Sequence, residues 1–472
     1  MEKEIKFILN NRMITTKLDP LMSTLKFLRD DQGLKSVKLS CGEGECGACT
    51  VLLGDLTDGT VKYRNVASCI LPIGDINGKH LVTLEGINGN DLNLIQKIMV
   101  SEGAIQCGFC TPGFVMSMTG FFLDDVPKTD KNILNAIDGN ICRCTGYVPI
   151  RRASKKLVNI YESYEKTENT VEKLIELSLI PSYFKSIPKR LSAIPVVDNE
   201  SDFSKDKLLV AGGTDLLIGD KVGKVDKEPQ FLFERKELRE IFIKKNMIYI
   251  GSGVTTEQIR RSEIIKKSIK DIDKFLTLVS SSIIRNRATL GGNIVNASPI
   301  GDLSVLFLAV ESSLIISSQG NEREIMLKDF FKGYKDFDLN KGEIIKYLKF
   351  RKTDEDERIN FEKVSRRKHL DIASCNSGIR IRYNEGKIQT CSISAGGVAP
   401  VPLFLKKISS FLEGKFMNEH NLKEAVEFLK DEISPISDIR GSAVYKKELM
   451  VRLIISHFIK LFPDIIDPGE IL

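Results

Sequence analysis

The chain has 472 residues, more than one ordinary hydrophobic core holds, which predicts about three domains. Hydrophobic residues make up 42% and charged residues 28%, and no long apolar run occurs, so the composition predicts a soluble globular protein without a membrane span. The net charge of +6, from 69 basic and 63 acidic residues, is a small excess that indicates no nucleic-acid partner. The charged amino-terminal segment has no h-region or cleavage site typical of a secretory signal, which favours a cytoplasmic location.

Residues 1–85 predict a small sheet crossed by one helix. Residues 4–16 alternate around Asn10-Asn11 as in a hairpin, and a helix is predicted from Asp19-Pro20 to Gly33. The glycine-rich segment 40–49 is predicted to be a loop that leads into a strand at Thr50. This arrangement resembles a plant-type ferredoxin domain.

Residues 86–165 change to helical periodicity and predict a small helical domain. Four helices are expected, at Asp91–Ser101, Thr111–Leu123, Thr129–Asp138 and Pro149–Tyr164. Thr111-Pro112 is typical of an N-cap followed by a proline at the first helical position, and Gly139 stands where a C-terminal cap is expected.

Residues 166–182 are polar and predict a linker, within which Val171–Leu177 favours a helical turn. Mixed strand and helix patterns follow, as in an α+β domain, with helices predicted at Leu422–Leu429 and Lys446–Ile459.

Eight of the ten cysteines lie in the first third of the chain, a distribution that indicates metal ligands rather than disulfides in a cytosolic protein. Cys41, Cys46 and Cys49, with Cys69 further on, have the C-x4-C-x2-C spacing of plant-type [2Fe–2S] proteins. Glycines between them let the backbone wrap closely around a cluster. A structural zinc site is the alternative, although its ligands usually come in two closely spaced pairs.

A second quartet combines Cys107 and Cys110 with Cys142 and Cys144. Each pair stands at the end of a predicted helix, where the helix dipole stabilises thiolates. This spacing is less specific, so a zinc site or a dithiol redox pair stays open beside a second cluster.

Two glycine turns are candidate phosphate contacts. Ala211-Gly212-Gly213-Thr214-Asp215 follows the apolar run Leu208–Val210, and its backbone N–H groups could approach a pyrophosphate, although such a turn is more often plain structure. Thr289-Leu290-Gly291-Gly292-Asn293 is the second turn, and the two in series are more specific. By contrast, Gly251–Thr256 lacks the third glycine of a dinucleotide fingerprint and predicts a strand end with a capped helix.

Several strings together give the chain a family resemblance. The iron–sulfur part contains CGEGECGAC (41–49), CGFCTPGF (107–114) and CRCTGY (142–147). The later part contains LVAGGTDLL (209–217), IRNRATLGGNIVNASPIGD (284–302), SAGGVAPVP (394–402) and DIRGSAVYKKEL (438–449). These strings resemble the xanthine dehydrogenase (molybdenum hydroxylase) family, and their fusion resembles the small subunit of bacterial members, with fused [2Fe–2S] and FAD-binding domains.

The resemblance implies an α+β multidomain fold with a β-grasp ferredoxin domain and a four-helix [2Fe–2S] domain. It further implies an α+β FAD-binding domain of the PCMH/vanillyl-alcohol-oxidase-like type at 183–357 and a C-terminal α+β subdomain at 358–472. FAD contacts are implied at Leu209, Val210, Ala211, Gly212, Gly213, Thr214, Asp215, Leu216, Thr289, Leu290, Gly291, Gly292, Asn293 and Asp302. Val279 and Ser280 are implied beside the flavin or adenine, Ile345 beside the cofactor, and Lys363 as a charged contact.

The resemblance also implies two [2Fe–2S] clusters that pass electrons from a molybdopterin-binding large subunit to FAD and on to NAD⁺, in an α2β2 heterotetramer that oxidises xanthine to urate. The helical-domain cluster is implied nearer molybdenum, and no catalytic side chain is expected in this chain. Alternatives are the same subunit of an aldehyde or nicotinate hydroxylase, a non-catalytic iron–sulfur carrier or redox sensor, and a zinc-stabilised binding module. Cys375 and Cys391 are expected to be core residues, and Arg366-Arg367-Lys368 a solvated loop or a contact to nucleotide phosphates.

Overall fold

The computed structural model describes residues 4–89, 91–164, 167, 169–195, 203–220, 227–233, 235–318, 320–367 and 370–471. The chain divides into two compact units. The first comprises Met1–Glu200, Leu208–Phe233 and Ser281–Arg287, and the second comprises Ser201–Lys207, Glu234–Ser280 and Ala288–Leu472. The predicted boundaries at 85, 165, 182 and 357 stay predictions, and Lys166 and Glu168 of the predicted linker lie outside the described residues.

The first unit begins with a five-stranded sheet in the order β2-β1-β5-β3-β4. Its parts are β1 (Ile5–Leu9), β2 (Arg12–Thr16), α1 (Thr24–Lys26), a π-helical turn η1 (Phe27–Asp31), β3 (Thr50–Thr57), β4 (Thr60–Ala67), η2 (Ser68–Ile70), η3 (Ile73–Ile76) and β5 (His80–Val82). β1 pairs with β2 across the predicted hairpin and runs parallel to β5. The predicted turn at Asn10-Asn11 is confirmed, because Asn10 has a φ of 52° between the paired residues Leu9 and Arg12.

The predicted helix start at Asp19-Pro20 is wrong. The Asp19 carboxylate accepts a hydrogen bond from the Leu21 N–H at 2.9 Å, which makes a local turn instead. The helix begins after Ser23, whose side chain accepts from the Lys26 N–H, and Gly33 follows its end with a φ of 66°.

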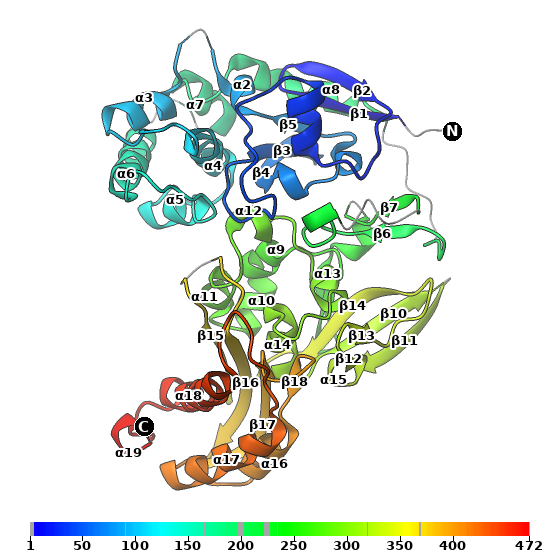
Figure 1. Ribbon diagram of the computed structural model, residues 1–472, viewed down its shortest axis with the longest axis vertical. Helices are drawn as coiled ribbons and strands as arrows, with labels where there is room; N and C mark the ends of the chain where they lie inside the picture. The colour runs from blue at the N-terminus through cyan, green and yellow to red at the C-terminus, as the bar shows by residue number, and fades with distance from the viewer. Residues whose placement is uncertain are drawn as a thin grey trace. The chain divides into compact units, whose positions relative to one another are not determined.

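The helical part of the first unit lies beside this sheet, with α4 against β3 and β4 (Figure 1). It consists of α2 (Leu84–Ile87), α3 (Leu94–Ser101), α4 (Thr111–Leu123), α5 (Asp130–Ala136), α6 (Val148–Glu162), α7 (Thr170–Glu176), η4 (Ser182–Ser186) and α8 (Ile187–Ser192). All four predicted helices are present, as is the predicted turn after residue 170. β6 (Leu208–Val210) and β7 (Pro229–Phe231) form a parallel pair, and α12 (Ser282–Arg285) completes this unit.

Two predicted caps in this part are wrong. Cys110 occupies the N-cap of α4, so Thr111 and Pro112 are its first helical residues. Gly139 does not take the left-handed conformation of a C-terminal cap. A side chain at Gly139 would lie 2.9 Å from Cγ1 of Ile283, so close packing explains this glycine.

The described residues of the second unit form two larger antiparallel sheets and one two-stranded antiparallel sheet. The first has the order β11-β10-β14-β9-β8 and the second β15-β16-β17-β18. Their strands are β8 (Ile241–Lys244), β9 (Met247–Gly251), β10 (Ser313–Ser318), β11 (Asn321–Met326), β14 (Ile344–Arg351), β15 (Glu357–Val364), β16 (Cys375–Asn384), β17 (Lys387–Gly396) and β18 (Leu403–Phe404), and β12 (Phe331–Gly333) pairs with β13 (Asp336–Phe337).

Helices α14 and α18 pack against the second of these sheets (Figure 1). The helices of this unit are η7 (Lys236–Leu238), α9 (Thr256–Arg261), α10 (Glu263–Ser268), α11 (Ile272–Thr277), α13 (Leu290–Val295), α14 (Asp302–Ala309), α15 (Leu327–Phe330), α16 (Lys406–Leu412), α17 (Glu419–Glu432), α18 (Ala443–Leu461) and α19 (Pro468–Ile471). α17 and α18 confirm the two helices predicted there. Among the described helices none is long and apolar enough to cross a membrane.

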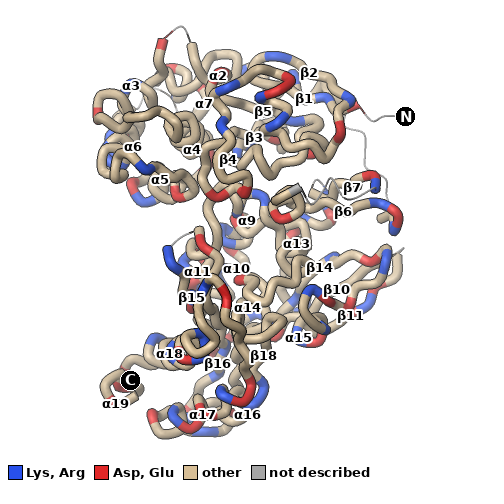
Figure 2. Tube along the Cα trace, in the orientation of Figure 1, with Lys and Arg blue, Asp and Glu red and all other residues tan. Residues whose placement is uncertain are grey.

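Charged residues of both signs alternate along each unit (Figure 2). This interspersed pattern agrees with the small net charge of +6. It resembles an ordinary solvated surface rather than the one-signed stripe of a nucleic-acid site.

Candidate iron–sulfur and flavin sites

The first cysteine quartet lies on the glycine-rich loop before β3 and on η2. Gly42, Gly44 and Gly47 have φ angles of 71°, 77° and 68°, a conformation that glycine adopts without strain. The loop therefore needs glycine where the sequence has it. The Sγ atoms of Cys49 and Cys69 lie 3.3 Å apart, and the Cys41 and Cys46 thiols share a hydrogen bond.

The second quartet also consists of two thiol pairs. Sγ of Cys144 lies 3.6 Å from Sγ of Cys107, and the Cys110 and Cys142 thiols share a hydrogen bond. Cys110 caps α4, and Cys144 stands shortly before α6, so each chain segment reaches the site at a helix start as predicted. The Thr145 hydroxyl lies 3.2 Å from Sγ of Cys142.

This paired arrangement fits a two-iron cluster. Each iron of a [2Fe–2S] cluster takes two thiolates, whereas one structural zinc ion takes four ligands at one point. Among the described residues no three His, Cys, Asp or Glu side chains meet where they could hold a single metal ion. The thiols of each quartet therefore match the ligand set of a cluster better than that of zinc.

Hydrogen bonds prepare some of these thiols to ionise. The bond from Cys41 lowers the pKa of Cys46 to about 6, against the opposing effect of burial. The bond between Cys49 and Cys69 likewise lowers the pKa of Cys49. In the second quartet, the Phe109 backbone N–H and the Cys144 thiol lower the pKa of Cys107. The same bonds raise the pKa of the partner thiols Cys41, Cys69 and Cys144. Each pair therefore shares a proton, which iron binding would displace because the thiolate is the form that binds metal.

Residues 140–142 join the two quartets. The Ile141 N–H donates to the Cys46 carbonyl at 3.0 Å, and Nδ2 of Asn140 donates to the Gly47 carbonyl at 3.1 Å. Cys142 is the next residue and belongs to the second quartet. The backbone of Cys46, in the first quartet, is therefore linked to that of Cys142, in the second, by one hydrogen bond and one peptide bond.

The quartets differ in exposure. Cys49 and Cys69 are buried, whereas Cys107 and Cys144 are exposed. Phe109, between two ligands of the second quartet, is 44% exposed, and Val148, shortly after Cys144, is 57% exposed. The second quartet therefore lies at a surface of the first unit, beside apolar side chains.

The first glycine loop also belongs to the first unit. β6 ends at Val210 as predicted, and the chain then turns through Gly213, whose φ is 75°. A side chain at Gly213 would lie 3.2 Å from Cδ of Pro72 and 3.4 Å from the Ile70 carbonyl. The loop thus packs against the segment that directly follows Cys69, a ligand of the first quartet.

The backbone N–H of Gly213 has no protein acceptor among the described residues, although the residue is buried. Buried N–H groups are nearly always paired, so this donor fits a ligand oxygen such as that of a diphosphate. Leu209, Val210, Ala211 and Gly212 precede it, and Thr214, Asp215 and Leu216 follow it, in one continuous segment.

The second glycine loop, in the second unit, uses its N–H groups internally. Gly291 donates to the Ser252 carbonyl at 2.8 Å, and Gly292 donates to Oγ1 of Thr289 at 3.1 Å. Thr289 is the N-cap of the short helix α13, Leu290 is buried, and Oδ1 of Asn293 accepts from the Ser304 hydroxyl. This loop can therefore offer close approach and side-chain atoms, but its glycine N–H groups are occupied.

Two of the charged residues implied for FAD, Asp302 and Lys363, bind each other. Nζ of Lys363 lies 2.7 Å from Oδ2 of Asp302 and also donates to the Leu278 carbonyl at 2.9 Å. Asn376 donates to the other Asp302 oxygen at 2.6 Å. Lys363 thus fixes the residue before Val279. Val279 and Ile345 are buried in the core of this unit.

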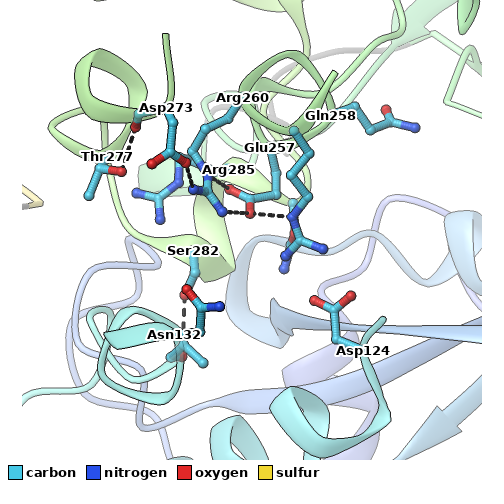
Figure 3. Close-up of polar contacts among 12 residues, drawn as sticks. Asp124, Asn132, Glu257, Gln258, Arg260, Asp273, Thr277, Ser282 and Arg285 are labelled. Atoms are coloured by element: carbon cyan, nitrogen blue, oxygen red, sulfur yellow. Dashed lines mark hydrogen bonds and ion pairs between the residues drawn. The ribbon is translucent and has the colours of Figure 1, made fainter. Parts of the chain in front are cut away.

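The segment Gly251–Thr256, which only partly matches a dinucleotide fingerprint, leads into the start of a helix. Thr255 accepts from the Gln258 N–H, and the Gln258 side chain accepts from Thr255, which confirms the predicted cap. The Glu257 carboxylate accepts hydrogen bonds from Arg260 and Arg261. Arg260 also pairs with Asp273 (Figure 3). A carboxylate at this position disfavours phosphate binding.

Cys375 and Cys391 are buried on β16 and β17, as predicted. Burial raises the pKa of Cys375 to about 12, which favours an unreactive thiol. In the basic run, Arg367 pairs with Asp371 and Arg366 donates to the Ile439 carbonyl, while Lys368 lies outside the described residues.

Sequence reasoning missed the buried ion pairs that organise these sites. Arg285 pairs with Asp138 at 3.0 Å, and Arg287 pairs with Asp75. Both arginines lie in the IRNR string and are almost fully buried. Two arginines next to a glycine turn in an otherwise apolar segment are the one sequence signal that could have indicated them.

Two thiol quartets arranged in pairs lie in the same unit as a buried glycine loop whose Gly213 N–H has no acceptor among the described residues. This arrangement fits an iron–sulfur flavoprotein. Four family descriptions match the chain in series. They are "2Fe-2S iron-sulfur cluster binding domain" (7–73), "[2Fe-2S] binding domain" (83–155), "FAD binding domain in molybdopterin dehydrogenase" (190–350) and "CO dehydrogenase flavoprotein C-terminal domain" (360–461). The chain is homologous to the amino-terminal region of xanthine dehydrogenases and carries the iron–sulfur and FAD-binding domains found in molybdenum hydroxylases.

Curated relatives agree with this assignment. Xanthine dehydrogenase of Emericella nidulans is 29% identical over 99% of this chain and 39% of its own length. Xanthine dehydrogenase of Oryza sativa is 30% identical over 93% of this chain and 38% of its own length. The chain therefore spans about two fifths of the length of these relatives.

Solved structures show the same fold in part of the chain. A Cu,Mo-CO dehydrogenase chain aligns with a TM-score of 0.51 at 22% identity, over 53% of this chain and 88% of its own. A chain of quinoline 2-oxidoreductase from Pseudomonas putida 86 aligns with a TM-score of 0.50 at 24% identity, over 54% and 89%.

Proposed function

We propose that the chain is the iron–sulfur and FAD part of a xanthine dehydrogenase-type molybdenum hydroxylase. In this proposal it takes electrons from a molybdopterin-binding partner subunit and delivers them through two [2Fe–2S] clusters and FAD to NAD⁺. When bound, clusters supply one-electron steps and flavin converts these to two-electron chemistry. The residues of this chain bind and orient these groups, and none acts as nucleophile or general base.

The connection between the quartets and the first glycine loop carries the proposal. The Ile141 N–H bonds to the Cys46 carbonyl at 3.0 Å, and Gly213 packs on the segment after Cys69. Electron transfer slows steeply with distance, so direct protein contacts between successive sites favour a relay. These contacts support a path for the electrons from the second quartet to the first quartet and then to FAD. The residues that bind FAD in this path are those that the family resemblance implies.

The exposed second quartet favours entry of electrons from a partner. Cys107 and Cys144 are exposed, and Phe109 and Val148 beside them present apolar surface. Exposed apolar surface around a redox site suits the docking of another protein. We infer that the molybdopterin-binding subunit contacts this surface, in an α2β2 heterotetramer in the cytoplasm.

The names of the curated relatives favour xanthine as the substrate, with xanthine, NAD⁺ and water converted to urate and NADH in purine metabolism. A quinoline oxidoreductase among the similar structures supports other heterocycles as alternative substrates, and the family resemblance adds aldehydes. The substrate pocket belongs to the partner in this proposal. A substrate screen on the native complex, with NADH formation as the readout, therefore decides between xanthine, nicotinate and an aldehyde.

Anaerobic titration of the isolated chain with NADH tests the relay itself. The proposal predicts bleaching of the flavin absorbance followed by reduction of the clusters, seen as new EPR signals. Reduction by dithionite but not by NADH would contradict NAD⁺ as the acceptor. Full clusters without co-purifying FAD would favour the non-catalytic carrier instead.

A further inference from the structure

Arg287 is a buried cation that contacts the first glycine loop. Its Nε and one terminal nitrogen both donate to the Gly212 carbonyl, at 3.3 and 3.1 Å. That terminal nitrogen also binds the Asp75 carboxylate, and both side chains are at most 3% exposed. The guanidinium carbon lies 3.7 Å from the centre of the Phe233 ring. Arg287 is therefore fixed on three sides.

The hydrogen bonds from Arg287 to the Gly212 carbonyl set the direction of one peptide group. The Gly212 carbonyl and the Gly213 N–H belong to the same planar trans peptide, so they point in opposite directions. Because the carbonyl faces Arg287, the N–H faces away from it. This is the buried N–H without a protein acceptor among the described residues.

We propose that Arg287 is the positioning residue that presents the Gly213 N–H to the diphosphate of FAD, anchored through Asp75 to the ferredoxin-type sheet domain. This inference rests on the proposed function, since it takes the first glycine loop as a diphosphate site. Asp75 lies on η3, shortly after the segment Ile70–Pro72 against which Gly213 packs. The same domain thus holds the first quartet and fixes the flavin loop.

A double variant tests the assignment without leaving a buried charge. Replacing a buried ion pair by apolar residues of similar size often preserves folding, whereas removing one partner does not. The double variant Asp75→Leu with Arg287→Met removes the hydrogen bonds to the Gly212 carbonyl. The matched control variant combines Arg285→Met with Asp138→Asn in the same segment, which likewise leaves no unpaired buried charge. The side-chain oxygen at position 138 can still accept both hydrogen bonds from Ser282, which are 2.8 Å long.

The measurements are iron content and the dissociation constants of FAD and ADP for flavin-depleted full-length chain. We expect the double variant to retain its iron and to bind both ligands at least about tenfold more weakly, because ADP carries the same diphosphate. Arg287→Lys, which keeps the charge but has a single donor group, should fall between wild type and double variant. The control variant should change the constants less than about threefold.

Unchanged FAD affinity in an iron-replete double variant of Asp75 and Arg287 would overturn the assignment, as would an equal loss in the control variant. A loss for FAD but not ADP would also overturn it, because the effect would then lie away from the diphosphate. If the double variant fails to hold iron, Arg287→Lys decides: wild-type affinity overturns the assignment and weaker binding of both ligands supports it. A wild-type chain that binds no FAD would instead refute the proposed function.

Discussion

The two cysteine quartets are built differently although both pair their thiols. The first is embedded: Cys49 and Cys69 lie in the apolar core of the sheet domain. The second has two exposed ligands and depends on the starts of two helices. The difference indicates that the first quartet contributes to the fold of the unit, whereas the second is placed for exchange with another molecule.

The largest difference is expected from removing one ligand of each quartet. Cys69→Ala should lose the first cluster and lower the thermal midpoint by about 10 °C, because metal binding there is coupled to folding of the core. Cys144→Ala should lose the second cluster with a shift of less than about 5 °C. Iron analysis and calorimetry measure both, and equal shifts would contradict the embedded character of the first quartet.

Two glycines offer a matched test of how tightly each loop is packed. Gly47 and Gly108 have φ angles of 68° and 79°, so alanine is strained at both. A side chain at Gly47 would lie 2.4 Å from Nδ2 of Asn140, whereas one at Gly108 would meet nothing within 4 Å. We expect Gly47→Ala to cost about 3 kcal/mol of unfolding free energy and Gly108→Ala about 1 kcal/mol.

Denaturant unfolding with iron absorbance as the probe measures both costs. The Asn140 contact links the two quartets, so Gly47→Ala should also shift the spectrum of each cluster. Equal costs at the two positions would show that the link through residue 140 adds nothing.

We expect acid to destabilise the sheet domain by protonating His80. Burial lowers the pKa of His80 to about 4, while its ring bonds the Tyr63 hydroxyl at 2.7 Å and the Asn10 carbonyl at 2.8 Å. Above about pH 6.5 the ring is neutral in both the folded and the unfolded chain, so the contribution of the neutral, buried His80 to the unfolding free energy is fully present. As the pH falls from 6.5 to 4, the unfolded chain takes up a proton that the folded chain refuses, so about 3 kcal/mol is lost.

His80→Gln should flatten the dependence of the unfolding free energy on pH in this window. The loss of iron from the first quartet in acid should become slower in the same variant. A wild-type slope in His80→Gln would show that another group controls acid unfolding of this unit.

The smallest expected difference concerns iron removal from the native chain. A hydrophilic iron chelator should take iron from the second quartet about tenfold faster than from the first, because Cys107 and Cys144 are exposed. Stepwise loss of two EPR signals during chelation would follow this order. Simultaneous loss would contradict the difference in exposure as the controlling factor.

Local patterns in the sequence predicted most of the fold and of the cysteine ligands. Helical spacing located α4 at Thr111–Leu123, and the alternation at residues 4–16 located the first hairpin, because both depend on neighbours in the chain. Helix starts were less predictable. Asp19 and Thr111 are residue types that often cap helices, but Asp19 caps a turn and Thr111 is already inside its helix.

Contacts between distant segments could not be predicted. Arg287 meets Asp75 across 212 positions of sequence, and nothing near either residue indicates its partner. The second glycine loop resembles the first in sequence, but Thr289 and Ser252 accept its glycine N–H groups, whereas the Gly213 N–H has no acceptor in the described part of the chain. Tertiary structure alone distinguishes them.

Metal and flavin analysis of the purified full-length chain, combined with EPR after dithionite reduction, tests the central claim most directly. The account predicts about four iron atoms and about one FAD per chain, with two distinguishable cluster signals. Zinc in place of iron, or a single cluster signal with about two iron atoms, would contradict it.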